Sequence, residues 1–444
     1  MENNIIYLPV VKDCSYLDIE ANLAIRINEC FTSKNVFRIS NTLKEEELPV
    51  LTYDHIKKKW LTGRYIGKIY FKHQNLDYCF EIQPRYGNAT VMHLLEEIFN
   101  IKLANNNVSN KLQTTHQNEL IKKLISFIWV KQLSKANIHG LPKNRVKKRC
   151  KESTIKGRID IRKSILPLYN ENLIVSERNE KQIDTVILNI LNIAYKVLTK
   201  KYYLTKNMLS ESATEMINSS SGLHNTSVSE SQYKNIKYGS IYSNFKAIVD
   251  FSWNIIQHKQ NDLAPEQSRH NGDALFLDMA EVWEKYLLTI FRKKYGKDGW
   301  SVYSSKFTIY NNQYFKRGLI PDIIIEKENN VIVLDAKYKN MSNAWHDYDR
   351  ADFFQIHTYG SYMEAHRKKL IGIGLLYPLN KNMDLKELEN NLSINLFGET
   401  DHSTWFKVDG IKLTENIEEL NCNKIAFLER FDEKLKISLK VKYN

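Results

Sequence analysis

The chain has 444 residues, of which 43% are hydrophobic and 26% charged, a composition typical of folded globular proteins that excludes a disordered chain. This length accommodates two or three domains with substantial cores. The 64 basic against 51 acidic residues leave a net charge of +13, which favours polyanionic partners, chiefly nucleic acid.

The cysteine spacing and the hydropathy of the chain indicate the cellular compartment of the protein. The five cysteines show neither CxxC nor Cys/His spacing, which argues against a zinc site or a disulfide framework and fits a reducing cytoplasm. The N-terminus has no basic leader followed by an apolar core, so we expect no secretory signal. The apolar run at residues 186–198 is interrupted by Asn and Lys, so we expect no membrane span and a cytoplasmic protein.

The first two thirds of the chain change character near residue 88. Residues 60–87 alternate apolar and polar side chains on both sides of "KHQN", which predicts a β-hairpin in a β-rich N-terminal segment. Residues 88–262 show helical apolar spacing, with a small-polar loop at residues 219–232. The densest basic cluster, "KNRVKKRCK" (143–151), is interpreted either as a solvated loop or as a site that binds phosphate or a partner.

The last third follows a connector at residues 261–273 and predicts alternating helices and strands. We expect an amphipathic helix over residues 274–296, ended by Gly296, and a second helix over residues 348–366. Strands are expected in "WSVYSSKFTIY", "LIPDIIIEK", "NVIVLDAKYK", "LIGIGLLYP", "TWFKVDGIKL" and "KLKISLKVKY".

This order of elements predicts a mixed α+β protein. The N-terminal segment is β-rich, the central region is helical, and the C-terminal part is a mixed sheet flanked by helices. The predicted domains are residues 1–170, 171–265 and 266–444.

Two acids and a lysine stand at the ends of the predicted hairpin "RGLIPDIIIEKENNVIVLDAKYKN" (317–340). Asp335 and Lys337 are two residues apart, so a strand places both on one face, and pairing through the turn brings Asp322 alongside. Neighbouring carboxylates repel unless a cation lies between them, and oxygen ligands suit Mg²⁺, with Mn²⁺ as a substitute. Lys337 could orient or deprotonate a water and stabilise negative charge, which indicates metal-assisted phosphodiester hydrolysis. The alternative is a salt bridge between Asp335 and Lys337, with Asp322 capping a turn.

Flanking helices offer further candidates. Glu281 and Glu284 lie one turn apart, and we favour Glu284 as a third metal ligand because it follows Trp283 in the apolar stripe; an exposed helical face is the alternative. Gln355 and Tyr359 share a helix face; Gln355 is the catalytic candidate, whereas helix–sheet packing is favoured for Tyr359. Near the proposed centre, the candidates for phosphate contacts are the basic residues Lys306, Lys316 and Arg317, with solvated surface charge as the alternative.

The "PD…DAK" pattern, with the preceding helix and the following "QIHTY", resembles the PD-(D/E)xK nuclease superfamily. More narrowly, the chain resembles McrC, the nuclease subunit of McrBC-type restriction systems that act on modified DNA. The segments that carry this resemblance span roughly residues 60 to 365: "GRYIGKIYF…FEIQPRYG", "IKGRIDIRKSI", "SERNEKQIDTVILNILNIAYKVL", "LFLDMAEVWEKYLLTIF" and "IPDIIIEKENNVIVLDAKYK".

The resemblance implies that Asp322, Asp335 and Lys337 are the metal-binding acids and the lysine of a Mg²⁺-dependent endonuclease. It also implies a McrB-like AAA+ GTPase hexamer as partner, which recognises and translocates DNA; the chain itself has no GxxxxGK[ST] loop among its sixteen glycines. Residues 1–170 are then the candidate motor-contacting region, with the role of the first sixty left open.

We therefore predict a DNA endonuclease subunit of a motor-driven restriction complex, acting in antiviral defence on DNA modified, for example, with 5-methylcytosine. Two alternatives stay open: a regulatory adaptor of an AAA+ ring with a vestigial nuclease centre, and a free-standing metal-dependent nuclease.

Overall fold

A computed structural model describes most of the chain: residues 5–31, 36–39, 48–100, 117–220, 227–261, 275–311, 316–339, 350–366, 368–383, 393–395 and 404–440. The chain divides into two compact units, Met1–Ile121 together with Asn261–Asn444, and Lys122–Gln260. The predicted domain boundaries at residues 170 and 265 stay predictions. Among the helices so described, none combines the length and apolar character needed to cross a bilayer.

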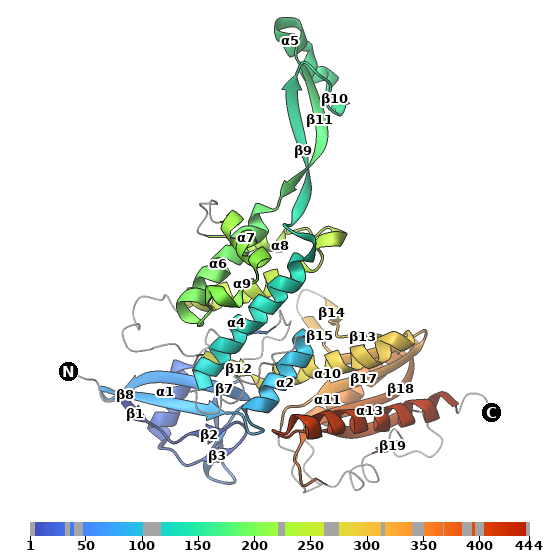
Figure 1. The fold of residues 1–444 in the computed structure, drawn as a ribbon. Coiled ribbons are helices and arrows are strands. Elements are labelled where there is room, and N and C mark those ends of the chain that lie inside the picture. Colours follow the sequence, from blue (N-terminus) through green and yellow to red (C-terminus); the bar gives the residue numbers. More distant parts are fainter. Residues whose placement is uncertain are drawn as a thin grey trace. The chain divides into compact units, whose positions relative to one another are not determined.

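The first unit contains an N-terminal sheet with the strand order β1-β8-β7-β12-β4, in which β2 also pairs with β8 (Figure 1). The predicted hairpin is confirmed: β7 (Tyr65–His73) and β8 (Leu76–Gln83) pair antiparallel. Gln74 and Asn75 both have positive φ in the two-residue turn, which suits the twist of a tight hairpin. The other strands here are β1 (Ile5–Tyr7), β2 (Val11–Lys12) and β4 (Val36–Phe37), and a small separate sheet holds β3 (Tyr16–Leu17), β5 (Leu51–Asp54) and β6 (Lys59–Thr62).

The helix predicted over residues 274–296 begins later than expected. Residues Leu275–Asp278 form a strand, β12, that pairs antiparallel with β7 and parallel with β4, and the helix α10 spans Met279–Tyr295. Asp278 caps it by accepting a hydrogen bond from Ala280 N at 2.9 Å. Phe276 of β12 joins the core of the N-terminal sheet, which α1 (Ala21–Cys30) covers. This strand therefore ties α10 to the N-terminal sheet.

The C-terminal sheet has the order β13-β16-β17-β18-β20-β19. Its antiparallel β16–β17 hairpin is followed by parallel pairing of β17 with β18 and of β18 with β20, which confirms a mixed sheet and a mixed α+β fold. The strands are β13 (Ser301–Tyr303), β16 (Ile323–Lys327), β17 (Asn330–Ala336), β18 (Lys369–Leu379), β19 (Ser393–Asn395) and β20 (Trp405–Lys412). A separate pair is formed by β14 (Phe307–Asn311) and β15 (Lys316–Leu319).

Helices cover both faces of this sheet. Helix α11 (Arg350–Ala365) packs on one face, where its Ile356 and Met363 join a core with Val333 of β17. On the other face lies α13 (Ile417–Lys440), whose Phe431 contacts Trp405 of β20 and Phe291 of α10. Helix α2 (Asn88–Phe99) follows the N-terminal hairpin.

The strand predicted for "KLKISLKVKY" is wrong as far as residue 440, because these residues belong to α13. Its alternation resembles a strand, but the buried side chains Phe427, Phe431 and Leu435 recur every fourth residue, so helical packing prevails. Residues 441–444 lie outside the described residues.

The second unit is not wholly helical, contrary to the prediction. Residues Lys143–Glu152 form the strand β9, which pairs antiparallel over its whole length with β11 (Ile174–Ile183), while β10 (Arg158–Ile159) pairs with β11 (Figure 1). The basic cluster is thus a strand and not a loop. The helices of this unit are α4 (Gln117–Ala136), α5 (Ile161–Glu171), α6 (Thr185–Lys201), α7 (Glu211–Ser220), α8 (Glu230–Lys234) and α9 (Phe245–Asn261). Of the predicted loop at 219–232, residues 221–226 lie outside the described residues.

Candidate active site

Asp322 and Asp335 lie side by side at neighbouring strand ends. Ile323 of β16 pairs with Leu334 of β17, and this register places Asp322, just before β16, beside Asp335 near the end of β17. Asp322 Oδ2 accepts a hydrogen bond from Ala336 N at 2.8 Å. Both carboxylates are buried, with 2% of Asp322 and none of Asp335 exposed, and buried acids need a cation or hydrogen-bond donors beside them.

Lys337 connects these acids to helix α11. Its Nζ lies 2.5 Å from Asp335 Oδ2, donates to Gln355 Oε1 at 2.7 Å and lies 3.3 Å from Asp352 Oδ1. Burial by itself lowers the pKa of Lys337, but the carboxylates around it, Asp335 first, outweigh burial and raise this pKa. The side chain is therefore a fixed ammonium group at neutral pH.

Gln355 is positioned by a second hydrogen bond. Its Nε2 donates to the Tyr359 hydroxyl at 2.7 Å, and that hydroxyl donates to the Ile320 carbonyl at 3.3 Å. Tyr359 therefore does more than pack helix against sheet: it links Gln355 to the segment that leads into Asp322.

Asp352 is an acid of this site that the sequence analysis missed. It is 4% exposed and lies on α11, three residues before Gln355. Besides Lys337, it accepts hydrogen bonds from Lys339 Nζ at 2.8 Å and from the Tyr377 hydroxyl at 3.4 Å. The signal that could have found it is its i, i+3 spacing to Gln355, which places both on one helix face.

The two acids on α10 have different partners. Glu281 Oε2 accepts a hydrogen bond from Ile39 N at 3.2 Å, which binds α10 to the segment after β4 of the N-terminal sheet. Glu284 is buried, and its Oε1 lies 3.0 Å from Lys285 Nζ. Between them, Trp283 Nε1 donates to the Leu376 carbonyl at 3.1 Å, which anchors α10 beside the strand next to Asp335.

Within the part of the chain that the structure describes, no group of three or more His, Cys, Asp or Glu is close enough to hold a metal ion. Glu284 thus completes no such group with Asp322 and Asp335, and its role as a ligand stays a prediction. Two buried carboxylates alone nevertheless suit Mg²⁺, which accepts one or two carboxylates and keeps several waters.

The basic residues predicted to contact DNA are only partly defined. Lys306 is exposed just before β14, and its side chain lies against Gly318 of β15. The backbone of Lys316 and Arg317 belongs to β15, but their side chains lie outside the described residues.

The fold and the site define a class first: a mixed α+β protein with two buried acids and a lysine at the strand ends of its C-terminal sheet. The sequence profile described as "McrBC 5-methylcytosine restriction system component" matches residues 61–378. The chain belongs to this family, which confirms the resemblance inferred from its motifs. No curated protein matches the sequence.

Two solved structures are similar to this chain. A refined half-complex from a tetradecameric assembly of Thermococcus gammatolerans McrB AAA+ hexamers with bound McrC is 14% identical, with a TM-score of 0.49, and the match covers 96% of this chain and 100% of the other. A cryo-EM structure of the Thermococcus gammatolerans McrBC complex is 12% identical, with a TM-score of 0.37, over 65% of this chain and 87% of the other.

Proposed function

We propose that the chain is the DNA-cleaving subunit of a McrBC-type restriction complex and that Asp322, Asp335 and Lys337 form its cutting centre. The observation that carries this proposal is the pair of buried carboxylates beside an ammonium group held 2.5 Å from one of them. The alternative is structural: a salt bridge of Asp335 to Lys337, with Asp322 capping the backbone at Ala336, and the cleavage test below decides between the two.

The residues have separate roles in this reaction. Asp322 and Asp335 would hold Mg²⁺, or Mn²⁺ in its place, with Glu284 as a further candidate ligand. When bound, this ion would acidify a water and offset negative charge on the phosphate. Lys337, held by Asp335, Asp352 and Gln355, stabilises the charge that develops as the phosphodiester bond breaks. Orientation or deprotonation of the attacking water is the other role proposed for Lys337.

DNA is the substrate that the charge of the chain favours, and Lys306, Lys316 and Arg317 are candidate phosphate contacts. Family membership supports modified DNA, such as DNA with 5-methylcytosine, as the target of an antiviral cytoplasmic system.

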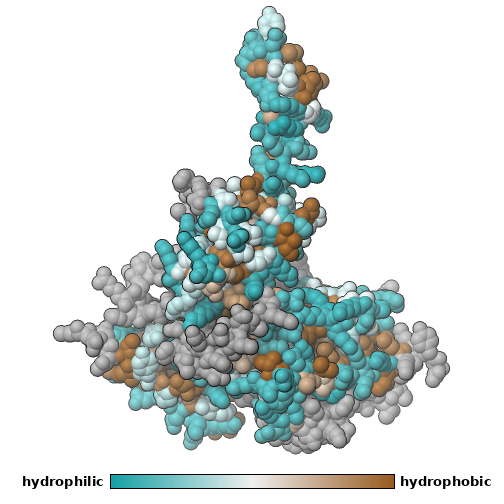
Figure 2. Space-filling model, viewed as in Figure 1, coloured by the Kyte–Doolittle hydropathy of each residue, from teal (hydrophilic) through white to brown (hydrophobic). Residues whose placement is uncertain are grey.

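The proposed partner is a McrB-like AAA+ GTPase hexamer, contacted by residues within 1–170. An exposed apolar surface on α5 supports this proposal (Figure 2). Helix α5 buries Ser164 against strand β11, where the Ser164 hydroxyl donates to the Val175 carbonyl. Its large apolar side chains are exposed: Ile161, Ile165, Leu166, Leu168 and Tyr169. Five exposed apolar residues on one short helix are typical of a protein-binding surface. This surface also suits the adaptor role, which can coexist with cutting.

The test is cleavage of methylated and unmodified DNA by the complex of this chain with its AAA+ partner, in Mg²⁺ with GTP or ATP. Asp335→Asn is expected to lower the rate of DNA cleavage at least about 100-fold and to leave assembly of the complex and nucleotide hydrolysis intact. Glu328→Gln, which removes an exposed carboxylate from the β16–β17 turn, is the matched control.

The outcomes separate the candidate functions. Full cleavage by Asp335→Asn would reject the cutting centre. Stimulated nucleotide hydrolysis without cleavage by the unaltered chain would leave the adaptor role. Cleavage by the chain alone, without nucleotide or partner, would favour the free-standing nuclease.

A further inference from the structure

The segment that follows the proposed catalytic lysine is held from the N-terminal part of the first unit. β17 ends at Ala336, and Lys337 N donates one more hydrogen bond, to the Leu376 carbonyl of β18 at 2.9 Å. From there the chain leaves the sheet through Tyr338 and Lys339. Because Lys337 stands at this exit, whatever holds these two residues also fixes the backbone from which the ammonium group reaches Asp335.

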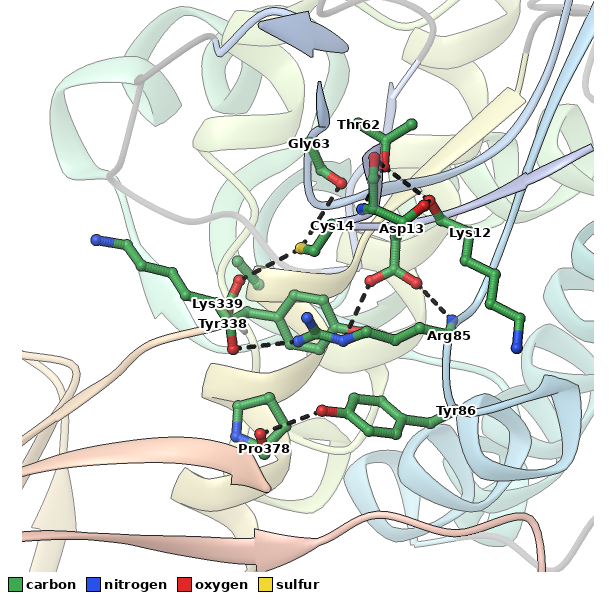
Figure 3. A network of polar contacts seen from close by, with 12 residues as sticks. Lys12, Asp13, Cys14, Thr62, Gly63, Arg85, Tyr86, Tyr338, Lys339 and Pro378 are labelled. Atoms are coloured by element: carbon green, nitrogen blue, oxygen red, sulfur yellow. Dashed lines mark hydrogen bonds and ion pairs between the residues drawn. The ribbon is translucent and has the colours of Figure 1, made fainter. Parts of the chain in front are cut away.

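Arg85 contacts both exit residues (Figure 3). Its guanidinium lies over the Tyr338 ring, 4.5 Å from the centroid, and its NH2 group donates to the Lys339 carbonyl at 3.4 Å. The Cys14 thiol adds a weak contact to the Tyr338 carbonyl at 3.9 Å. A cation over an aromatic face and a donor to a carbonyl both constrain position, so Arg85 grips the exit segment at two points.

Asp13 in turn fixes Arg85. One carboxylate oxygen accepts a hydrogen bond from Arg85 N at 2.6 Å, and the other lies 3.6 Å from its Nε. Asp13 N itself donates to the Gln83 carbonyl at 3.0 Å, next to the pairing of β2 with β8. Asp13 is fully buried, and a buried ion pair of this kind holds one geometry because either charge alone is costly there.

A neighbouring contact joins the same two sheets. The Tyr86 hydroxyl donates to the Pro378 carbonyl of β18 at 3.1 Å. A pocket of about 510 Å³ lies beside these residues, and its lining includes Asp13, Arg85, Tyr86, Asn380 and Thr414. In Arg85→Gln the backbone amide of residue 85 still donates to Asp13, and the pocket lets water reach the Asp13 carboxylate, so this variant is expected to fold.

We propose that Arg85, fixed by Asp13, is a positioning residue for Lys337: it clamps Tyr338 and Lys339 and so holds the lysine backbone at the proposed cutting centre. The inference rests on the proposed function, because it gives the N-terminal sheet a direct part in cleavage. It also connects residues within the proposed motor-contacting region to the acids that would bind the metal.

The test has two readouts on the full chain with Arg85→Gln. First, hydrogen exchange of the Lys337 amide, which donates to the Leu376 carbonyl, is expected to be at least about tenfold faster in the chain alone, while exchange in the middle of β18 is unchanged. Second, in the complex with its AAA+ partner, kcat for DNA cleavage is expected to fall about tenfold with KM for DNA unchanged.

Two further variants sharpen the result. Arg85→Lys keeps a positive charge beside Asp13 but loses the planar stacking on Tyr338, so it is expected to restore part of kcat. Arg26→Gln, which removes a half-buried arginine from α1, is the matched control and is expected to change neither readout.

Unchanged amide exchange in Arg85→Gln would overturn the clamp, and faster exchange with unchanged kcat would overturn its role in positioning Lys337. If the unaltered complex cleaves no DNA, the proposed function fails, but the exchange measurement still decides whether Arg85 holds the exit segment.

Discussion

The carboxylate of Asp352 in helix α11 lies 3.3 Å from the ammonium group of Lys337, which directly follows strand β17, although residues outside the described part of the chain separate the two. The same carboxylate accepts a hydrogen bond from Lys339. The negative charge of Asp352 thus pairs with the ammonium groups of Lys337 and Lys339. Lys337 has one charged partner in the sheet, Asp335, and one in helix α11, Asp352.

Asp352→Asn is expected to lower the DNA cleavage rate about tenfold, because Lys337 keeps Asp335 but loses its second charged partner and becomes less well ordered. Binding of the AAA+ partner is expected to be unchanged. The measurement is single-turnover cleavage by the complex, with Asp18→Asn, at an exposed site, as control. A cleavage rate equal to that of the unaltered chain would show that Asp352 is only structural.

Glu97 predicts a pH dependence of stability. Burial alone would raise its pKa, but hydrogen bonds from Lys293 and Lys424 lower the pKa of Glu97 to about 2. A carboxyl whose pKa is lowered on folding stabilises the fold fully above its ordinary pKa of 4.5, and this contribution is lost as the pH falls toward 2.

Glu97→Gln is therefore expected to reduce the free energy of unfolding by about 2 kcal/mol at pH 7, with the difference shrinking below pH 4.5. Urea unfolding over a pH series measures it. The exposed Glu20→Gln serves for comparison. A difference that stays constant down to pH 3 would refute the assignment.

The exposed apolar surface of α5 predicts a partner contact. Leu166→Asp is expected to weaken binding of the AAA+ partner at least about tenfold without changing stability, because this side chain is 72% exposed in the chain alone. Titration with the labelled partner measures the change. Ile56→Asp, at another exposed apolar residue, should bind normally. Equal affinities of both variants and the unaltered chain would exclude α5 from the interface.

Cys14 beside the Arg85 clamp is expected to be unreactive. Burial raises the pKa of the Cys14 thiol to about 11; the Asp13 carboxylate adds to this rise and the Arg85 guanidinium opposes it. Almost no Cys14 thiolate is therefore present at pH 8. Iodoacetamide is expected to label the exposed Cys422 at least about tenfold faster than Cys14 in the folded chain, and both equally in urea. Mass spectrometry of the peptides measures this. Rapid labelling of Cys14 would mean that the clamp region opens.

Local sequence patterns predicted the elements whose apolar residues alternate or form continuous runs. The β7–β8 hairpin followed from alternation around a short polar turn, whereas β17 and β18 followed from continuous apolar runs and are buried on both faces. The helix α11 was also predicted. The pairing of Asp322 with Asp335 also followed, because a short hairpin fixes the register of its two strands.

Other features leave no local signal. Both faces of the β9–β11 ribbon meet solvent, so its cations pair with acids across the strands, as Lys148 does with Glu180, and no apolar alternation arises. β12 consists of three apolar residues and Asp278, which also caps α10, so the strand is too short to stand out from the helix that follows it directly. The contact of Arg85 with Tyr338 joins distant segments, and only the folded chain brings them together.

The most direct test of the cutting centre is the rate of DNA cleavage by the complex over a range of Mg²⁺ concentrations, with Asp322→Asn compared to the unaltered chain. We expect the unaltered chain to reach a saturating rate, whereas Asp322→Asn binds the same DNA and partner but stays at least about 100-fold slower at every Mg²⁺ concentration. An Asp322→Asn complex that reaches the rate of the unaltered one would contradict this expectation.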